Sequence, residues 1–388
     1  MTTSVNDSHL QPNHLKMGTI HYNKQYKAEF WNELREEVKQ YFESNSLTPY
    51  ASKSLWAKKI FLLMLFAGTY FSLFIFNLPL WGLWLLTILL GLLMSAIGFN
   101  ISHQAAHGAL SPNPKINRIM GFSLNLMGMS DYIWMLKHNV SHHAYTNIYE
   151  NDEALKEDET LRLSNDAAWK PLHQFQQLYT PLVYAFFTIF WATTLDFDKL
   201  KRYNGWGSRT PKSHPKSEIL LFWFTKIFFV TAYLILPYYF LKITFGQLMI
   251  GFFTFQLVGS TFITHILQVE HLNEDTKVVS LNDDGCIPVS WAVNQLEGTA
   301  NFKIKNSVFQ WFIGPVNYQI EHHLFPHIAG NHLPQIAKIV EAKALKYGLN
   351  YHSFPSFNEA VISHYKLLKK LGEKPVHLKA ANSEFSTL

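Results

Sequence analysis

The chain has 388 residues, 48% of them hydrophobic, with a formal net charge of only +5 at neutral pH. Most of the apolar residues lie in two long blocks, so length alone does not give the number of domains, and the small net charge argues against nucleic acid as a partner. The single cysteine, Cys286, excludes an intrachain disulfide and favours polar regions that face a reducing cytoplasm.

The N-terminal residues, 1–54, are polar and of mixed charge. They lack a short apolar core preceded by positive residues, which argues against a cleavable signal peptide. We therefore expect a cytoplasmic N-terminal segment at 1–54, and membrane insertion through internal segments of the chain.

The first apolar block, residues 60–114, contains no Asp, Glu, Lys or Arg. Its most apolar part is about twice as long as the ~20 residues that cross a bilayer as a helix. Asn77, Pro79 and Gly82 supply a break in this part. We therefore predict a hairpin of two transmembrane helices at residues 60–78 and 80–101.

Two histidine groups follow the first predicted hairpin. His103 and His107 come directly after the second predicted span, and His138 and His142 repeat the same spacing, with His143 beside them. Residues four apart lie on one face of an α-helix, so each pair is expected to point in one direction.

Two further apolar stretches, residues 119–135 and 178–195, resemble spans at first sight. Asp131 interrupts the first, and the second is barely long enough to cross a bilayer. A crossing by either stretch alone would put some histidines on opposite sides of the membrane. We therefore predict interfacial or re-entrant helices for both.

The second apolar block, residues 219–269, carries only Lys226 and Lys242 as formal charges. Its length predicts a second hairpin, with spans at 219–241 and 243–269. Basic residues gather before the first and third spans, and positive residues favour the cytoplasmic side, so the polar mass is expected in the cytoplasm. These residues are Lys53, Lys58, Lys59, Lys199, Lys201, Arg202, Arg209, Lys212 and Lys216.

The third histidine group is His322 and His323, with Gln319 one helical turn earlier as a weaker ligand. His265 lies near the cytoplasmic end of the fourth predicted span, where an ionisable side chain points to function, and we predict it as a further ligand. His271 lies beyond that span and is left out. His327 and His332 are interpreted as surface residues, and the remaining, isolated histidines are assigned no role.

The metal follows from the number and type of these ligands. Structural zinc normally takes four ligands and prefers some thiolate, which one cysteine cannot supply. Ferrous iron binds weakly among divalent metals, so many imidazoles shared by two non-haem irons would hold them and leave positions open for O₂. The predicted ligands are His103, His107, His138, His142, His143, His265, His322, His323 and Gln319, and the seven histidines of the three groups are the predicted catalytic residues.

Such a set of imidazoles makes a net cationic site, which nearby carboxylates would offset. Acidic side chains outside the ligand set can also orient an imidazole through its second ring nitrogen. Asp152, Glu153, Glu270 and Glu321 are candidates because they lie near the histidines in the sequence.

The three groups resemble the histidine boxes of the membrane fatty acid desaturases. They read HQAAH at 103–107, HNVSHH at 138–143 and QIEHH at 319–323, and the similarity runs from about residue 55 to about 345. The glutamine form of the third box is similar to that of front-end and bacterial linoleoyl-CoA desaturases. The stretch 295–302, QLEGTANF, strengthens the resemblance. No HPGG motif of a fused cytochrome b5 occurs in this sequence.

The resemblance implies that O₂ is activated at two irons and that a cis double bond forms in a fatty acyl chain, carried as acyl-CoA or as a membrane lipid. Electrons are then expected from a separate cytochrome b5 or ferredoxin-type donor. In similar proteins a histidine near the end of the fourth span completes the metal shell, which favours His265.

Together these observations predict an all-α, multi-pass membrane protein. Four transmembrane helices form two hairpins, and a cytoplasmic helical cap carries the di-iron site. The expected divisions are the N-terminal segment at 1–54, a membrane desaturase domain at 55–345 and a cytoplasmic C-terminal tail at 346–388.

Three alternatives remain open at this point. A lipid hydroxylase or carotenoid ketolase would use the same iron chemistry and would add oxygen to its product. A haem-bearing membrane cytochrome needs histidines inside the bilayer, and adjacent pairs do not serve axial ligation. A transporter with a histidine proton relay would place its ionisable residues along the spans.

Overall fold

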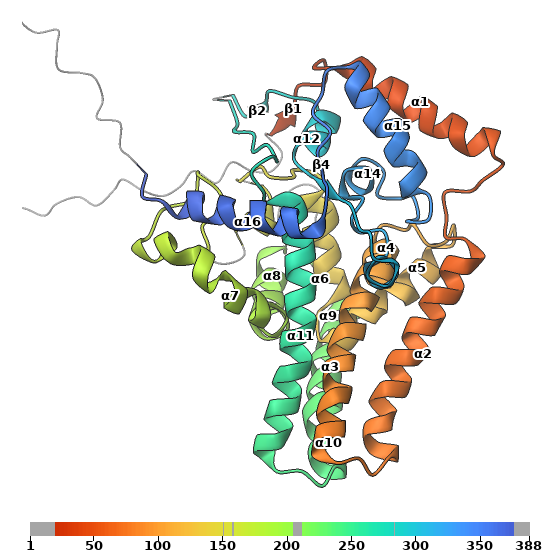
Figure 1. The fold of residues 1–388 in the computed structure, drawn as a ribbon, viewed down its shortest axis with the longest axis vertical. Helices are drawn as coiled ribbons and strands as arrows, with labels where there is room; N and C mark the ends of the chain where they lie inside the picture. The colour runs from red at the N-terminus through yellow and green to blue at the C-terminus, as the bar shows by residue number, and fades with distance from the viewer. Residues whose placement is uncertain (1–19, 150, 157–158, 205–211, 283, 376–388) are drawn as a thin grey trace, which may run out of the picture.

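The computed structural model describes residues 20–149, 151–156, 159–204, 212–282 and 284–375. These residues are mostly helical, with two pairs of short parallel strands. Figure 1 shows an elongated molecule in which long helices form a bundle at one end and shorter helices form a cap at the other. The prediction of a mostly helical chain with membrane-spanning helices is confirmed.

All four predicted spans are helical. The bundle contains α2 (Lys53–Ile75), α3 (Leu80–Ile97), α9 (Lys216–Val230), α10 (Leu236–Phe240) and α11 (Phe245–His271). The π-helical turn η1 (Gly98–Ser102) joins α3 to α4 (His103–Ala106), and η7 (Thr231–Ile235) joins α9 to α10. Helix α2 begins earlier than predicted because the Ser52 hydroxyl caps it by accepting a hydrogen bond from the N–H of Leu55.

Among the described residues, five helices are long and apolar enough to cross a membrane: Lys53–Ile75, Leu80–Ala106, Pro171–Arg202, Lys216–Phe240 and Phe245–His271. The unexpected one is Pro171–Arg202. It is longer than the predicted stretch 178–195 because turns and a short helix extend α7 at both ends. Its parts are η5 (Pro171–Phe175), α7 (Gln176–Phe190), η6 (Trp191–Leu195) and α8 (Asp196–Arg202).

Helix α7 differs from the bundle helices in direction. In Figure 1 it runs obliquely beside α11, near the end of the bundle that meets the cap. The other stretch predicted to be interfacial, 119–135, is divided among α5 (Pro114–Gly121), η2 (Phe122–Met127) and α6 (Asp131–Met135). Each of these pieces is too short to span a bilayer.

Helices α3 and α11 approach each other closely through small residues. A Cβ atom added at Gly91 would lie 2.6 Å from the backbone oxygen of Phe255, and one at Gly259 would lie 3.0 Å from the oxygen of Gly91. The Ser95 hydroxyl donates a hydrogen bond to the Gly259 carbonyl at 3.0 Å. Small residues and hydroxyl contacts of this kind hold helices together in membranes. This contact fixes the two helices that lead to the first histidine box and to His271.

The cap has its own apolar core between α1 (Ala28–Ser44), α12 (Trp291–Glu297), α14 (Gln319–Leu324) and α15 (Leu333–Lys346). Two strand pairs fasten it: β1 (His21–Tyr22) pairs with β2 (Cys286–Ile287), and β3 (Asn301–Phe302) pairs with β4 (Ser353–Phe354). Helix α13 (Ser307–Ile313) precedes α14 in the chain. The core holds α14, and with it the third histidine group, in one position.

The predicted C-terminal tail contains α16 (Phe357–Gly372), which packs on the bundle. The Nδ1–H of His364 donates to the Leu272 carbonyl at 2.6 Å, and its Nε2 lies 3.0 Å from the Tyr184 hydroxyl. Parts of the predicted terminal segments, residues 1–19 and 376–388, lie outside the described residues, as does Arg209 of the basic run.

Candidate metal centre

Eight histidines from four separate segments converge where the bundle meets the cap. They form two groups, and within each group the candidate ligand atoms lie within 4.8 Å of one another. We name these the five-histidine group, consisting of His103, His107, His138, His143 and His322, and the three-histidine group, consisting of His142, His271 and His323. All seven histidines of the three sequence boxes are among them.

The second box lies on a π-helical segment, η3 (Leu136–His142). The His143 N–H donates to the His138 carbonyl at 2.9 Å, so residues five apart, rather than four, lie one above the other. The Nε2 atoms of His138 and His143 are 3.1 Å apart, in the five-histidine group, whereas His142 belongs to the three-histidine group. The prediction that His138 and His142 lie on one face of an α-helix is therefore wrong, because this segment is π-helical and the two histidines belong to different groups.

Each pair of adjacent histidines is divided between the two groups. His143 and His322 belong to the five-histidine group, while His142 and His323 belong to the three-histidine group. Neighbouring side chains point in different directions around a helix, because successive residues are separated by about 100°. The doubled histidines in the second and third boxes thus allow one helix to serve two ligand sets.

His265 and His271 both lie on α11, and only His271 joins the histidine groups. The Nε2 of His265 is 2.9 Å from the Tyr365 hydroxyl, and its Nδ1–H donates to the Thr261 carbonyl at 2.8 Å. Six residues on an α-helix correspond to a turn of about 240° from one direction to the other, so the two imidazoles face different sides. The structure therefore corrects the expected position: His271, and not His265, lies beside the box histidines.

Gln319 lies beside the three-histidine group. Its amide donates to the Nε2 of His271 at 2.8 Å, while its Oε1 is buried without a partner among the described residues. Gln319 thus contacts His271, the histidine that the sequence interpretation left out, and lies beside the three-histidine group.

Asp152 orients His142, as its proximity in sequence suggested. The Nδ1–H of His142 donates to the Asp152 carboxylate at 2.9 Å, which leaves Nε2 facing the group. The carboxylate also accepts backbone N–H groups from Asn147 and Ala154. Burial alone would raise the pKa of Asp152, but His142 and these hydrogen bonds hold it below its ordinary value.

Within the described part of the chain, the other three acidic candidates make no hydrogen bond to the histidine groups. Glu153 pairs with Lys199 and Arg202. Glu321 accepts a hydrogen bond from the Asn301 amide at 2.8 Å. Both carboxylate oxygens of Glu270 are buried without a hydrogen-bond partner among the described residues.

Two uncharged side chains that sequence reasoning did not single out orient His323. Its Nδ1–H donates to Gln295 Oε1 at 2.8 Å, and the Thr146 hydroxyl donates to the same oxygen at 2.8 Å. Thr146 follows the second box and Gln295 stands in the stretch 295–302. In the sequence, these two residues stand out only because they lie in or next to motifs similar to those of the desaturases. The fold then brings them together.

The donor atoms fit metal ions of borderline softness. The Nε2 atoms of His107, His322 and His323 are buried without hydrogen-bond partners among the described residues, and the Nε2 atoms of His103 and His138 lie 2.9 Å apart. Imidazole nitrogens are good ligands for zinc, copper, iron and nickel.

Five imidazoles outside the long helices favour the uncharged form that ligates metal. Burial, followed by the effect of neighbouring imidazoles, holds the pKa values of these five well below the ordinary value of histidine. These are His107, His138, His143, His322 and His323. Neutral rings keep a free lone pair at neutral pH, which a divalent cation requires.

A narrow cavity of about 130 Å³ opens beside the histidines. At one end it is lined by His103, His138, His142, His271 and Gln319. Its other walls are mainly apolar and come from η1, η2, α7 and α11; they include Phe99, Leu124, Met127, Phe187 and Ile263. The cavity could hold an apolar chain against the histidine groups.

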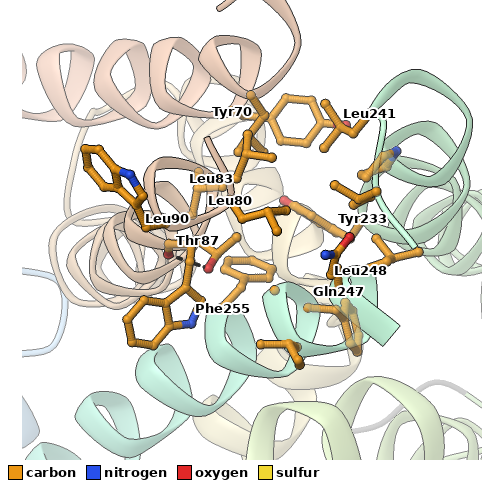
Figure 2. Close-up of a pocket in the computed structure, with 18 residues that line it drawn as sticks. Tyr70, Leu80, Leu83, Thr87, Leu90, Tyr233, Leu241, Gln247, Leu248 and Phe255 are labelled. Carbon is orange, nitrogen blue, oxygen red and sulfur yellow. Dashed lines mark hydrogen bonds between the residues drawn. The ribbon is translucent and has the colours of Figure 1, made fainter. Parts of the chain in front are cut away.

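A larger cavity of about 360 Å³ lies at the opposite end of the bundle (Figure 2). Its lining includes Tyr70, Leu80, Leu90, Tyr233 and Phe255, and no histidine or carboxylate is among the lining residues. This cavity is larger than the one beside the histidines, but it offers no group that could ligate a metal or move a proton at neutral pH. The chemistry is therefore assigned to the smaller cavity.

Comparison with known proteins gives a consistent result. The family model described as fatty acid desaturase matches residues 79–355, more than half of the chain. The sn-1 linoleoyl-lipid 6-desaturase of Synechocystis sp. is 31% identical over 357 residues, covering 89% of this chain and 96% of that protein. The enzyme of the same name from Arthrospira platensis is 30% identical, with 89% and 93% covered. Acyl-lipid (8-3)-desaturase B of Dictyostelium discoideum is 28% identical, with 91% and 78% covered.

Proposed function

Because this chain belongs to the fatty acid desaturase family and is an oxidoreductase of that class, we propose that it is a front-end acyl desaturase with a histidine-held di-iron centre. It inserts a cis double bond into a fatty acyl chain in an O₂-dependent reaction. The observation that carries the proposal is the convergence of eight imidazoles, in two groups, on one end of an apolar cavity.

The two histidine groups are the proposed ligands of the two irons. The five-histidine group would hold one ion, and the three-histidine group, with Gln319 beside it, would hold the other. When bound, the pair of irons supplies O₂ activation and the oxidising power to remove hydrogen from two adjacent methylene carbons. His265 is not proposed as a ligand, because its ring is bonded to Tyr365 and Thr261.

The side chains of the protein place the acyl chain and exclude water. An unactivated methylene has no polar handle, so the apolar walls of the cavity must determine which carbons lie beside the histidines. Asp152 and Gln295 hold His142 and His323 in fixed orientations, each through Nδ1, so that Nε2 faces the centre.

The reduction of O₂ to water also requires electrons that the acyl chain does not supply. Removing two hydrogens from the acyl chain supplies two of the four electrons that reduce O₂ to water, and two more must arrive with protons from elsewhere. We propose a separate cytochrome b5 or ferredoxin-type protein as their source.

We further propose that four helices cross the membrane, as two hairpins, with the cap and centre on the cytoplasmic side. The oblique course of α7 in Figure 1 supports an interfacial position for it. The basic residues at the cap end of α2 and α9, such as Lys53 and Lys216, support the orientation, because positive residues are retained in the cytoplasm.

For the substrate, we propose an acyl lipid with desaturation counted from the carboxyl end. The relatives support this class, since two are named as linoleoyl-lipid 6-desaturases and another as an acyl-lipid (8-3)-desaturase. The glutamine in the third box, Gln319, is consistent with the same group of enzymes.

The test is fatty acid profiling of a host that lacks polyunsaturated lipids, expressing this chain with and without added linoleate. The expected product is lighter than linoleate by two hydrogens, with the new double bond on the carboxyl side of the existing ones. A product heavier by one oxygen would instead make the chain a hydroxylase, and a new double bond on the methyl side would remove the front-end assignment.

A further inference from the structure

Gly98, Met127 and Ile263 lie together in the lining of the histidine-lined cavity. Gly98 lies five residues before His103, and Ile263 lies eight residues before His271, and no lining residue precedes them on these two helices. At ~1.5 Å per residue these positions lie about 7.5 and 12 Å along their helices from the histidines, on the bilayer side. Along these helices the cavity therefore extends from the proposed metal centre into the bundle as far as Gly98 and Ile263.

Gly98 is not required by close packing, unlike other glycines in the same helix pair. A Cβ atom there would lie 3.8 Å from Met127 Cε and 3.9 Å from Ile263 Cδ1, which are ordinary contact distances. At Gly91, by contrast, a Cβ would lie 2.6 Å from a backbone oxygen. The backbone of Gly98 is helical, with φ of −50°, so it tolerates other residues. The missing side chain leaves room in the cavity and serves no visible packing need.

The two ends of the cavity differ in polarity. Lys137, Asp152 and Gln268 line it near the histidines, whereas Met127 and Ile263 line it beside Gly98. Thr188 and Thr264 also line the cavity, but their hydroxyls already donate to Gln256 and to the Ser260 carbonyl. An acyl chain has a polar carboxyl end and an apolar methyl end, and only the methyl end can be buried at the apolar end without losing hydrogen bonds. The methyl end is thus the part of the chain that reaches Gly98.

Resting on the proposed function, we propose that Gly98, with Met127 and Ile263, forms the stop for the methyl end of the acyl chain. The side-chain volume at residue 98 then sets the longest acyl tail that can extend beyond the reacting carbons. A methyl group added here removes space for about one methylene. A leucine side chain occupies the end of the cavity and forces longer tails out of register with the histidines.

The test uses the same host, fed with fatty acids of increasing length, and compares desaturation of each length in the full-length chain. Gly98→Leu is expected to lower the ratio of long-chain to short-chain product by tenfold or more, since a single methylene in an apolar pocket contributes about 10- to 200-fold to specificity. Gly98→Ala should shift the ratio in the same direction by less. Ile263→Ala should shift it in the opposite direction, because it enlarges the cavity.

The matched control is Gly68→Leu. Gly68 lies on α2, and no atom stands within 4 Å of a Cβ added there, so this variant changes a glycine to leucine in a membrane helix without touching the cavity. Its product ratio should equal that of the unmodified chain. If Gly98→Leu is inactive, Gly98→Ala and Ile263→Ala decide, and unchanged ratios in both would overturn the proposal. Failure of the unmodified chain to desaturate any fatty acid would instead count against the proposed function itself.

Discussion

The two histidine groups differ in how their imidazoles are held. In the three-histidine group each ring has a partner outside the histidines: His142 has Asp152, His323 has Gln295, and His271 has Gln319. In the five-histidine group the ring nitrogen of His138 lies within hydrogen-bond distance of ring nitrogens of His103 and His143, and Trp134 stacks on His138. The ion proposed for the five-histidine group would thus be held by many ligands, whereas the ion proposed for the three-histidine group would be held by fewer ligands that are each fixed in orientation.

The largest expected effect comes from removing a ligand of the smaller group. His142→Ala should abolish the new unsaturated product and reduce bound iron, because only two imidazoles would remain and Asp152 would lose its partner. Iron per protein and product yield measure the effect. His173→Ala is the control: His173 is buried away from both groups and its ring bonds Lys170 and Glu159. Retained activity with full iron in His142→Ala would remove His142 from the centre.

The second prediction compares the two histidines of α11. His271→Ala should lose most of its bound iron and its activity, whereas His265→Ala should keep the iron, because the ring of His265 contacts Tyr365 and lies outside both groups. Metal analysis and product yield on the two variants, made in the same background, measure the difference. Loss of iron in His265→Ala with full retention in His271→Ala would reverse the assignment.

That pair of residues also shows the limit of sequence reasoning. Hydropathy predicted helices at all four proposed spans, because charge is nearly absent from 60–114 and 219–269. The helix that carries His265 and His271 was therefore predictable, but its rotation about its own axis was not. That rotation is fixed by the glycine contact with α3, between residues far apart in the sequence.

The same reasoning explains the register of the second box. Spacing by four predicts an α-helical pair, and nothing in the sequence HNVSHH marks a π-helical turn. The fold imposes that turn, and it moves His142 to the other group. Likewise, Gln295 and Thr146 lie 149 residues apart and meet only because α12 packs beside the second box. Proximity in sequence found Asp152, which is only ten residues from His142.

The third prediction weakens the orientation of the three-histidine group without removing a ligand. Asp152→Asn should lower iron affinity or activity by about 10- to 100-fold, as is typical when the partner of a metal-binding histidine is changed. The amide cannot accept the His142 Nδ1–H with the strength of a carboxylate. Asp131→Asn is the control, because it neutralises a buried carboxylate that pairs with Arg118. Equal effects in both variants would mean that Asp152 acts through stability alone.

The smallest expected effect concerns the hydroxyl of Thr146, which donates to Gln295 Oε1 and lies 3.2 Å from the Nδ1 of His323. Thr146→Val removes a hydroxyl whose single proton is shared between two acceptors, Gln295 Oε1 and the His142 carbonyl, each 2.8 Å away. A neutral hydrogen bond contributes about 0.5–1.5 kcal/mol, so activity should fall roughly two- to tenfold while iron per protein stays nearly unchanged.

Thr180→Val is a close match for this change. Thr180 is also fully buried, and its hydroxyl, like that of Thr146, donates to the carbonyl four residues earlier, here of Gln176 at 2.6 Å. Both variants lose a bond of the same kind, but only Thr146 contacts a residue that orients a histidine. Activity should therefore fall in Thr146→Val and not in Thr180→Val at equal thermal stability. Equal losses would show that buried hydroxyls support the fold generally, and that the three-histidine group does not depend on this partner for its orientation.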